Sequence, residues 1–158
     1  MKTKLLSLAL CLCLLVGAAL PLVSCKKSET PPAGTYTRMT VDINPSIEFM
    51  VDDQNKVVSV TALNDDGSIL IAGEAFVGKT PEEATQLVMQ LATDTGYLVK
   101  GEITVKDDAD GQTVSITVSG NSEYAKQLRE NVKSDVEKFL KDNKITATVK
   151  DVKAKTLE

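Results

Sequence analysis

The fold is decided at Val41-Asp42-Ile43-Asn44-Pro45-Ser46-Ile47-Glu48-Phe49, where two strand patterns meet at an Asn-Pro bond. Apolar residues alternate with polar ones on both sides of the bond, which predicts one half-buried strand over residues 36–43 and a second over residues 46–51. Pro45 has no amide hydrogen for a sheet ladder, so the chain must turn, bulge or lie at an edge there. Proline also disfavours the helical region for the residue before it, so we expect Asn44 to be extended.

Turn residues and a third strand follow the second strand. Asp52-Asp53-Gln54-Asn55 has the composition of a tight turn, and the alternation after it predicts a strand over residues 57–63. Asn64-Asp65-Asp66-Gly67 then closes that strand. Residues 68–77 mix apolar and polar side chains around a glycine, which predicts either a loop or a single turn of helix.

The clearest helix start in the chain lies at Thr80-Pro81-Glu82-Glu83. Thr80 suits the N-cap, Pro81 suits the first helical position, and Glu83 completes a capping box three residues after the cap. Apolar residues at helical spacing follow, so the helix is expected to bury one face. Gly96 ends the helix, in the left-handed conformation that glycine adopts at helix C-termini.

A hairpin, a second helix and a last strand are predicted after this helix. Residues 99–105 and 114–118 alternate as strands around Asp107-Asp108-Ala109-Asp110-Gly111, which predicts a hairpin. The acidic run lacks the later bidentate glutamate of an EF-hand loop, so we interpret it as a turn and expect no metal. An apolar stripe predicts a helix over residues 122–141, and residues 145–149 alternate as the last strand.

The N-terminal residues have the layout of a bacterial lipoprotein signal. Two lysines precede an apolar run over residues 5–23, and Leu22-Val23-Ser24-Cys25 places small residues before a cysteine. We expect residues 1–24 to be removed and the Cys25 sulfur to carry lipid, which anchors the protein to the cell membrane or outer membrane, outside the cytoplasm. The alternative is an uncleaved anchor helix, because the run is about long enough to cross a bilayer.

The mature chain has the size of one domain with a tether. The signal takes 24 of the 158 residues and two of the 18 basic side chains, which leaves 134 residues with 16 basic against 22 acidic groups, a net charge of about −6. The charges are mixed along the chain, so nucleic acid is not an expected partner. The polar, proline-bearing residues 25–35 form a linker, and the domain occupies residues 36–158.

Two absences in the composition exclude whole classes of site. The chain has no histidine and no tryptophan, so a histidine base, a histidine-ligated zinc site and a tryptophan-lined sugar platform are excluded. Cys25 is the single cysteine of the mature chain and is consumed by the lipid, so no disulfide forms within the monomer. No cofactor is expected.

Several motifs resemble the middle domain of RsgI-type anti-sigma factors in their order and spacing. They are Asp42-Ile43-Asn44-Pro45-Ser46-Ile47-Glu48, residues 57–67, residues 78–84 and Gly96-Tyr97-Leu98. The resemblance implies that the domain cuts itself between Asn and Pro and that the two pieces stay paired as strands. The helix, hairpin, helix and strand order is also similar to SEA-type and ferredoxin-like domains.

The elements together predict an α+β domain in the order βββ-α-ββ-α-β. Its sheet is expected to be largely antiparallel, with both helices on one face. This class agrees with the fold that the resemblance implies.

The Asn44-Pro45 bond offers a route to self-cleavage that needs no outside group. The side-chain nitrogen of Asn44 attacks its own carbonyl carbon, forms a succinimide and expels Pro45 as a secondary amine. Holding the reacting atoms in near-attack geometry supplies roughly 7 to 11 kcal/mol. Asp42 and Glu48 flank the bond at even spacing and are candidates for taking the amide proton; the alternative is that both are solvated strand carboxylates. For the whole motif, the alternative is a plain break between two strands.

We expect a non-enzymatic, lipid-anchored domain that acts in envelope signalling through strand pairing, with the membrane and an envelope protein as partners. The alternative is an uncleaved envelope lipoprotein that binds a ligand or a partner protein. An enzyme acting on an external substrate is disfavoured, because the mature chain has no histidine, no free thiol and no serine-centred motif. Only residues 1–4 precede the apolar run, so we do not expect this chain to sequester a sigma factor by itself.

Overall fold

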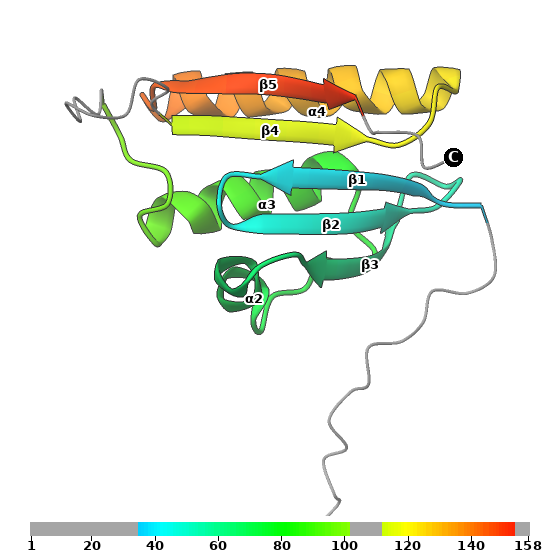
Figure 1. The fold of residues 1–158 in the computed structure, drawn as a ribbon, viewed down its shortest axis with the longest axis horizontal. Coiled ribbons are helices and arrows are strands. Elements are labelled where there is room, and N and C mark those ends of the chain that lie inside the picture. Colours follow the sequence, from blue (N-terminus) through cyan, green and yellow to red (C-terminus); the bar gives the residue numbers. More distant parts are fainter. Residues whose placement is uncertain (1–34, 102–111, 154–158) are drawn as a thin grey trace, which may run out of the picture.

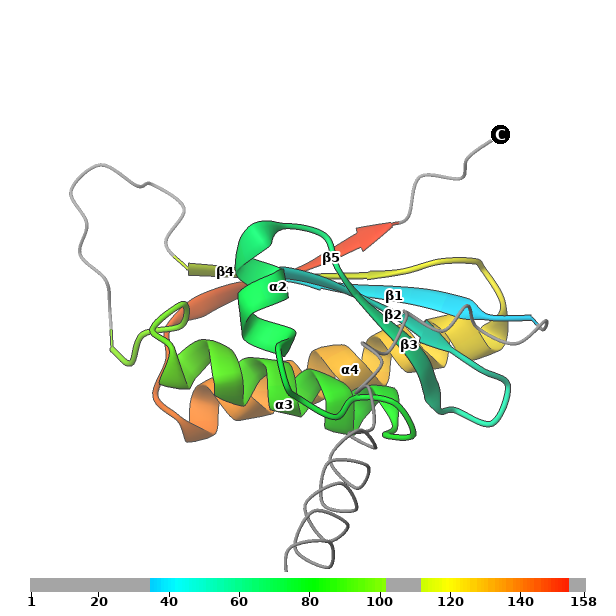
Figure 2. The ribbon, with the colours of Figure 1, turned by 90° about the horizontal axis from the view of Figure 1, so that it is seen from below.

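The computed structural model describes residues 35–101 and 112–153. Within these ranges the elements are, in chain order, β1 (Thr37–Asp42), β2 (Ser46–Val51), β3 (Val57–Ala62), α2 (Asp65–Ile71), α3 (Pro81–Asp94), β4 (Gln112–Val118), α4 (Glu123–Asp142) and β5 (Ala147–Lys153). The strands form one sheet in the order β3-β2-β1-β4-β5, and the two long helices, α3 and α4, cover one of its faces (Figures 1 and 2).

β1 is the middle strand of the sheet, although it comes first in the chain. It pairs antiparallel with β2 over its whole length, ending at the pair Asp42 and Ser46, and antiparallel with β4 over residues 39–42. β3 is antiparallel to β2, whereas β5 is parallel to β4 because α4 carries the chain back across the sheet. The expected α+β class, with a mostly antiparallel sheet, is confirmed, and β1 has a hydrogen-bonded neighbour on both edges.

Alternation along β1 turns one of its sides to the core. Met39 and Val41 are fully buried, so the alternation of the strand places Thr40 and Asp42 on its opposite face. Both long helices lie on one side of the sheet and leave the other side open (Figure 2). The expectation of two helices packed on one face is therefore confirmed. The core of the described chain consists of Met39, Val41, Ile47, Phe49, Val51, Val57, Leu70, Phe76, Ala84, Val88, Met89, Ala92, Leu98, Val114, Ile116, Val118, Ala125, Leu128, Val132, Val136, Leu140 and Ile145.

The predicted helix start at Thr80 is confirmed. The Thr80 hydroxyl accepts a hydrogen bond from the Glu83 N–H (3.2 Å), the Glu83 carboxylate accepts one from the Thr80 N–H (2.8 Å), and Pro81 is the first residue of α3. The second of these bonds is the main cause that lowers the pKa of Glu83. Gly96 follows α3 with φ of +85°, as expected, and Ser122 caps α4, the second predicted helix.

The prediction of a loop or a single turn over residues 68–77 is wrong at its start. The helix α2 begins earlier, because the Asn64 side chain accepts a hydrogen bond from the Gly67 N–H (2.8 Å) and Asp65 and Asp66 occupy the first turn. Asparagine, aspartate and glycine also favour tight turns, which is why the pattern alone predicts a turn there.

Some predictions fall outside the residues that the structure describes. These are the signal and Cys25, most of the linker, and the acidic turn over residues 107–111. Of the predicted strand over residues 99–105, the described part is residues 99–101, in which Gly101 makes an isolated parallel bridge with Ile145. The order in the described chain is therefore βββ-α-α-β-α-β, with α2 added to the prediction and that strand not among its elements.

Two properties of the described chain concern membrane and metal binding. Across residues 35–101 and 112–153, no helix has the length and apolar character that crossing a bilayer needs. The same ranges contain no cluster of three or more acidic or cysteine side chains placed to hold a metal ion.

Candidate functional site

The Asn44-Pro45 bond lies in a three-residue turn between β1 and β2. The last strand pair is Asp42 with Ser46, and the Ile43 N–H donates to the Pro45 carbonyl (2.9 Å) across the turn. Asn44, at the apex, is exposed and has φ of +60°, so the expectation that it is extended is wrong. Pro45 is buried and directly precedes β2. The chain turns at this proline, which has no N–H, and a turn is one of the three outcomes predicted.

Asp42 holds Asn44 in this left-handed conformation. Its Oδ1 accepts a hydrogen bond from the Asn44 N–H (3.1 Å), which forms an Asx turn at the end of β1. Asparagine enters the left-handed region more readily than most residues, although it still costs free energy there. The tight turn and this hydrogen bond together outweigh the preference for extended backbone that proline imposes on the preceding residue.

Asn64, the N-cap of α2, reaches across to the turn. Its Oδ1 accepts two backbone hydrogen bonds, from the Gly67 N–H (2.8 Å) and from the Ser46 N–H (3.1 Å). Its Nδ2 donates to the Oδ1 of Asn44 (3.0 Å). One side chain therefore contacts residues on both sides of the Asn44-Pro45 bond.

Gly67 allows the start of α2 to approach β2 this closely. A Cβ added at Gly67 would lie 2.5 Å from the Ser46 carbonyl oxygen, closer than real Cβ atoms come, and 3.0 Å from Asn64 Oδ1, which is a tight contact. The Ser46 oxygen also accepts a hydrogen bond from the Leu63 N–H (2.9 Å). The turn and the start of α2 are thus packed backbone against backbone, which leaves room for glycine alone.

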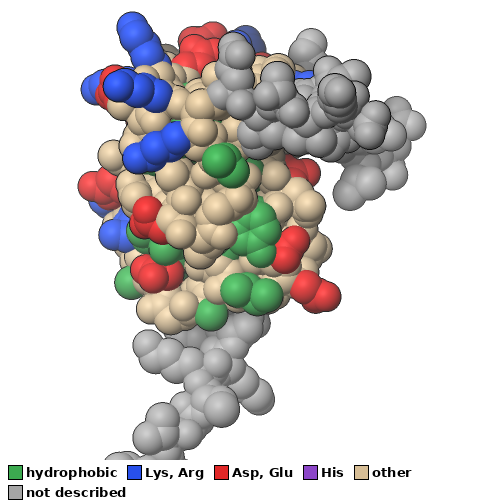
Figure 3. All heavy atoms as spheres, turned by 90° about the vertical axis from the view of Figure 1, so that its left-hand side faces the viewer, with side chains coloured by type: hydrophobic (Ala, Val, Ile, Leu, Met, Phe, Trp, Pro, Cys, Tyr) green, Lys and Arg blue, Asp and Glu red, His purple; other side chains and the backbone are tan. Residues whose placement is uncertain are grey.

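Tyr97, in the segment that follows α3, forms a hydrogen bond to the first turn of α2. Its hydroxyl donates to Asp66 Oδ1 (2.8 Å), and this hydrogen bond, followed by burial, raises the pKa of Tyr97. Leu63 and Ile69, which precede and follow Asp66 in the chain, are exposed, Ile69 by 69%. Figure 3 looks at the end of the molecule that carries the turn, and there apolar and acidic side chains share one half of the surface.

The two candidate carboxylates occupy different positions relative to Asn44. Asp42 contacts the Asn44 backbone, whereas Glu48 is 19% exposed and pairs with Arg38, whose Nε lies 3.3 Å from its Oε2. The structure therefore brings Asp42, Asn44 and Pro45 together and places Glu48 further along β2, on the open face. Asn64, which sequence reasoning missed, joins them.

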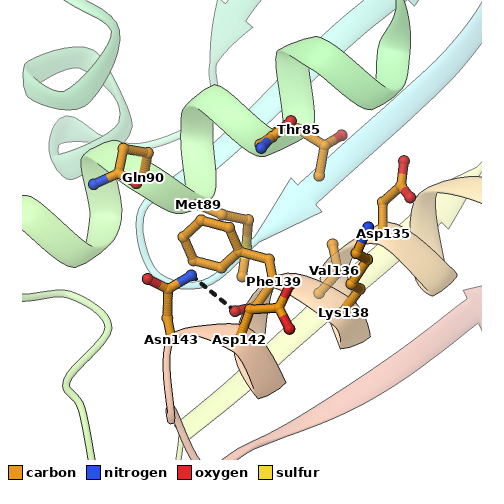
Figure 4. A pocket seen from close by; sticks show the side chains of 10 residues that line it. Thr85, Met89, Gln90, Asp135, Val136, Lys138, Phe139, Asp142 and Asn143 are labelled. Atoms are coloured by element: carbon orange, nitrogen blue, oxygen red, sulfur yellow. Dashed lines mark hydrogen bonds between the residues drawn. The ribbon is translucent and has the colours of Figure 1, made fainter.

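A groove of about 320 Å³ lies between α3 and α4 (Figure 4). Met89, Val136 and Phe139 contribute apolar side chains to its lining, and Asn143 donates from Nδ2 to the Phe139 carbonyl (2.9 Å). The groove contains no residue of the β1–β2 turn or of α2, so it is a separate candidate site. Its lining residues are Thr85, Gln86, Met89, Gln90, Asp135, Val136, Lys138, Phe139, Asp142 and Asn143.

Comparison with known proteins identifies the family of the domain. The sequence model of the family described as the anti-sigma factor RsgI-like central domain matches residues 36–158. Three similar proteins come from Acetivibrio thermocellus. Anti-sigma-I factor RsgI7 is 30% identical over 115 residues, or 72% of this chain and 20% of that protein; anti-sigma-I factor RsgI9 is 28% identical over 95 residues (60% and 12%); and anti-sigma-I factor RsgI3 is 34% identical over 67 residues (42% and 10%).

The match covers the whole described domain but a small part of the relatives. The chain spans a fifth of the length of anti-sigma-I factor RsgI7 and less of the other two. These relatives are named as anti-sigma factors, a regulatory class of protein, in agreement with the expectation of a non-enzymatic domain. On the family match over residues 36–158, this chain belongs to the family of anti-sigma factor RsgI-like central domains.

Proposed function

We propose that this domain is a lipid-anchored, extracytoplasmic signalling module that cuts itself once between Asn44 and Pro45. The observation that carries the proposal is the turn itself. Asn44 has a left-handed φ of +60° directly before a proline, and the Asn64 side chain holds its amide oxygen (3.0 Å). Strained backbone held by its surroundings is a frequent feature of reactive sites.

The cleavage balances without a co-reactant. The Nδ2 of Asn44 forms a bond to the Asn44 carbonyl carbon, and the bond from that carbon to the Pro45 nitrogen breaks. The proton lost from Nδ2 goes to the Pro45 nitrogen, which leaves as a secondary amine. The first piece then ends in a succinimide, which water opens. Asp42, whose Oδ1 lies 3.1 Å from the Asn44 backbone nitrogen, is the nearer of the two candidate carboxylates for relaying this proton.

Proline after the asparagine also prevents a competing reaction, the loss of the asparagine amide group. Asparagine usually loses its amide group when the backbone nitrogen of the next residue attacks the side-chain carbon. Pro45 has no N–H for that attack. The reaction that remains possible at Asn44 is attack by its own side-chain nitrogen, and the succinimide formed in this way cuts the chain.

The position of β1 gives the cut a consequence. After cleavage, the lipid-bearing piece would run from Cys25 to Asn44 and include β1, which has hydrogen-bonded neighbours on both edges and buries Met39 and Val41. The pieces would therefore stay together until a force or a partner protein in the envelope pulled β1 out. The relatives are named as anti-sigma-I factors, so we assign this separation step to envelope signalling in a sigma-factor pathway.

Cleavage is tested by the mass of the purified protein under denaturing conditions. At neutral pH the wild-type protein should give a fragment that begins at Pro45, identified by N-terminal sequencing, and the Asn44→Ala variant should stay intact. A wild-type protein that remains intact after prolonged incubation would remove the self-cleavage proposal. It would favour the uncleaved lipoprotein, whose ligand site would then be sought in the groove between α3 and α4.

Lipid anchoring is tested separately. Cells expressing the full chain should hold the protein in the membrane fraction, and the first piece should carry the mass of a lipid on Cys25. The Cys25→Ala variant should lose that mass and keep residues 1–24. Unmodified Cys25 in the wild-type protein would contradict the anchor without affecting the cleavage proposal.

A further inference from the structure

We propose that Asn64 is the positioning residue for the cleavage, because it determines which atom of the Asn44 amide is left to attack. The inference rests on the proposed self-cleavage and adds a residue to it. Asn64 lies 20 residues further along the chain, at the N-cap of α2, and its Nδ2 is 3.0 Å from Asn44 Oδ1.

The orientation of the two amides follows from backbone groups that cannot turn around. The Gly67 and Ser46 N–H groups both point at one atom of the Asn64 amide (2.8 and 3.1 Å), and two donors require an oxygen there. The other atom of that amide is then the nitrogen, which is a donor. The atom of Asn44 that it meets must be an acceptor, the oxygen Oδ1.

This orientation frees the nitrogen of Asn44. Attack by Nδ2 gives the succinimide, whereas the oxygen is occupied by Asn64. Within residues 35–101 and 112–153, the nitrogen of Asn44 donates no hydrogen bond to another residue. A hydrogen bond accepted at the amide oxygen also draws electron density from the nitrogen, which makes its proton easier to remove.

Asn64 also holds the leaving side of the bond. Its Oδ1 accepts from the N–H of Ser46, the residue after Pro45, so one rigid side chain contacts both halves of the cleavage site. Asn64 is itself fixed by the Gly67 N–H and by the close packing of Gly67 against Ser46. The geometry of the reacting atoms therefore depends on the start of α2, and positioning of this kind has large effects on rate.

The Asn64→Asp variant separates this role from that of a helix cap. Aspartate caps helices as well as asparagine, so α2 should stay and the midpoint of thermal unfolding should change little. Its carboxylate has no donor for Asn44 Oδ1 and instead attracts Asn44 Nδ2, which occupies the nucleophile. We expect cleavage to slow at least about tenfold at neutral pH, which is ~1.4 kcal/mol of activation free energy. The assay is intact mass during cell-free synthesis of the full chain.

The pH dependence of the cleavage rate distinguishes positioning by Asn64 from a purely structural role, which would leave that dependence unchanged. The two backbone N–H groups that face residue 64 stabilise its carboxylate and lower its pKa below the ordinary value of about 4, so the aspartate introduced by Asn64→Asp regains a proton, and can donate to Asn44 Oδ1, only below that pH. The rate of Asn64→Asp relative to wild type should then rise as pH falls, while Asn64→Ala shows no such recovery. Asp42, Asp65, Asp66 and Tyr97 also lie in or against this site, but they are common to all three proteins and cancel in the ratio.

Ser68→Ala is the matched control, because the Ser68 hydroxyl contacts the Asn64 carbonyl (3.2 Å) and not its side chain. This variant should cleave as wild type does. Three outcomes would overturn the inference alone: Asn64→Asp cutting at the wild-type rate, Asn64→Asp losing as much thermal stability as Asn64→Ala, or no recovery at low pH. Absence of cleavage in the wild type would overturn both this inference and the proposed function.

Discussion

Two turns of the same sheet are built alike and differ in what they can do. In the β1–β2 turn, Asp42 Oδ1 accepts the Asn44 N–H (3.1 Å), and Asn44 has φ of +60°. In the β2–β3 turn, Asp52 Oδ1 accepts the N–H groups of Gln54 (3.0 Å) and Lys56 (2.8 Å), and Asn55 has φ of +59°. An aspartate before a left-handed asparagine is therefore ordinary turn chemistry in this domain.

The difference lies in the next residue and in the partner of the asparagine side chain. Asn44 precedes Pro45, and its Oδ1 accepts a hydrogen bond from the Asn64 Nδ2 (3.0 Å). Asn55 precedes Lys56, and its Oδ1 accepts a hydrogen bond from the Tyr124 hydroxyl (2.8 Å). A left-handed asparagine alone is thus not a sign of reactivity. The β2–β3 turn becomes an internal control for the β1–β2 turn.

The largest difference between the turns is expected when each asparagine is lengthened to glutamine. Asn44→Gln keeps an amide but would have to close a six-membered ring from a displaced position, so cleavage should fall at least about a hundredfold, ~2.7 kcal/mol of activation free energy. Asn55→Gln should leave cleavage unchanged. Both variants place glutamine at a left-handed position and should lose similar thermal stability. Cleavage in both, measured by intact mass, would show that the turn and not the Asn44 amide is responsible.

Replacing Pro45 should make the β1–β2 turn react more like the β2–β3 turn, in which the residue after the asparagine has an N–H. Pro45→Ala restores an N–H after Asn44, which opens ordinary amide loss by attack of the backbone nitrogen on the side chain. Cleavage should fall at least about tenfold, and uncut chains should gain the mass difference of amide to acid at residue 44. Peptide mapping locates that change. Undiminished cleavage without amide loss would contradict the assigned role of Pro45.

A cut in the first turn would isolate β1, so the packing of β1 should decide whether the cut pieces separate. Met39 is fully buried between β1 and the helices, and Met39→Ala should cost about 2–5 kcal/mol of unfolding free energy. This is measured by urea denaturation in the uncut Asn44→Ala background. The cut form should then release the piece ending at Asn44 on gel filtration. Thr61→Ala, at an exposed position of β3, is the control and should retain the piece.

Most of the strands and the two long helices were predictable because their signals are local, whereas α2 was not, since its start has the composition of a turn. Alternation placed β1 and β2, and the capping box of Thr80 and Glu83 placed α3, each from a few adjacent residues. The parallel pairing of β4 and β5 depends on where α4 crosses the sheet, which no local pattern contains. The sequence therefore predicts the fold class better than it predicts which strands pair and in which direction.

The site was predictable only in part, because its geometry depends on competing preferences and on a distant contact. Proline predicts an extended Asn44, but the Asp42 hydrogen bond and the short turn prevail. Asn64 and Gly67 lie in a pattern that suits a turn or a helix start, and their role depends on contact with residues about 20 positions away. The glycine and asparagine within the family-like motif were the available signal, and the motif does not say what they contact.

Tyr124, the hydrogen-bond partner of Asn55 in the β2–β3 turn, should contribute to stability and not to cleavage. Tyr124→Phe removes the hydrogen bond to Asn55 and should cost about 0.5–1.5 kcal/mol of unfolding free energy at neutral pH, with cleavage at the wild-type rate. The contrast with Asn64→Asp, which should slow cleavage with little loss of stability, sharpens the comparison of the two turns. A changed cleavage rate in Tyr124→Phe would mean that the turns are coupled.

At alkaline pH, ionisation of the Tyr124 phenol should have a smaller effect on the stability of the domain. Burial, followed by the charges of Glu82 and Asp52, raises the pKa of Tyr124 above its ordinary value of about 10. The unfolded chain therefore releases this proton first, so the contribution of the phenol to stability is complete below about pH 10 and is lost as pH rises through the raised folded pKa. Tyr124→Phe should accordingly show a shallower fall of the urea midpoint above about pH 10 than wild type does. Equal slopes would mean that the phenol beside Asn55 keeps its ordinary pKa in the folded domain.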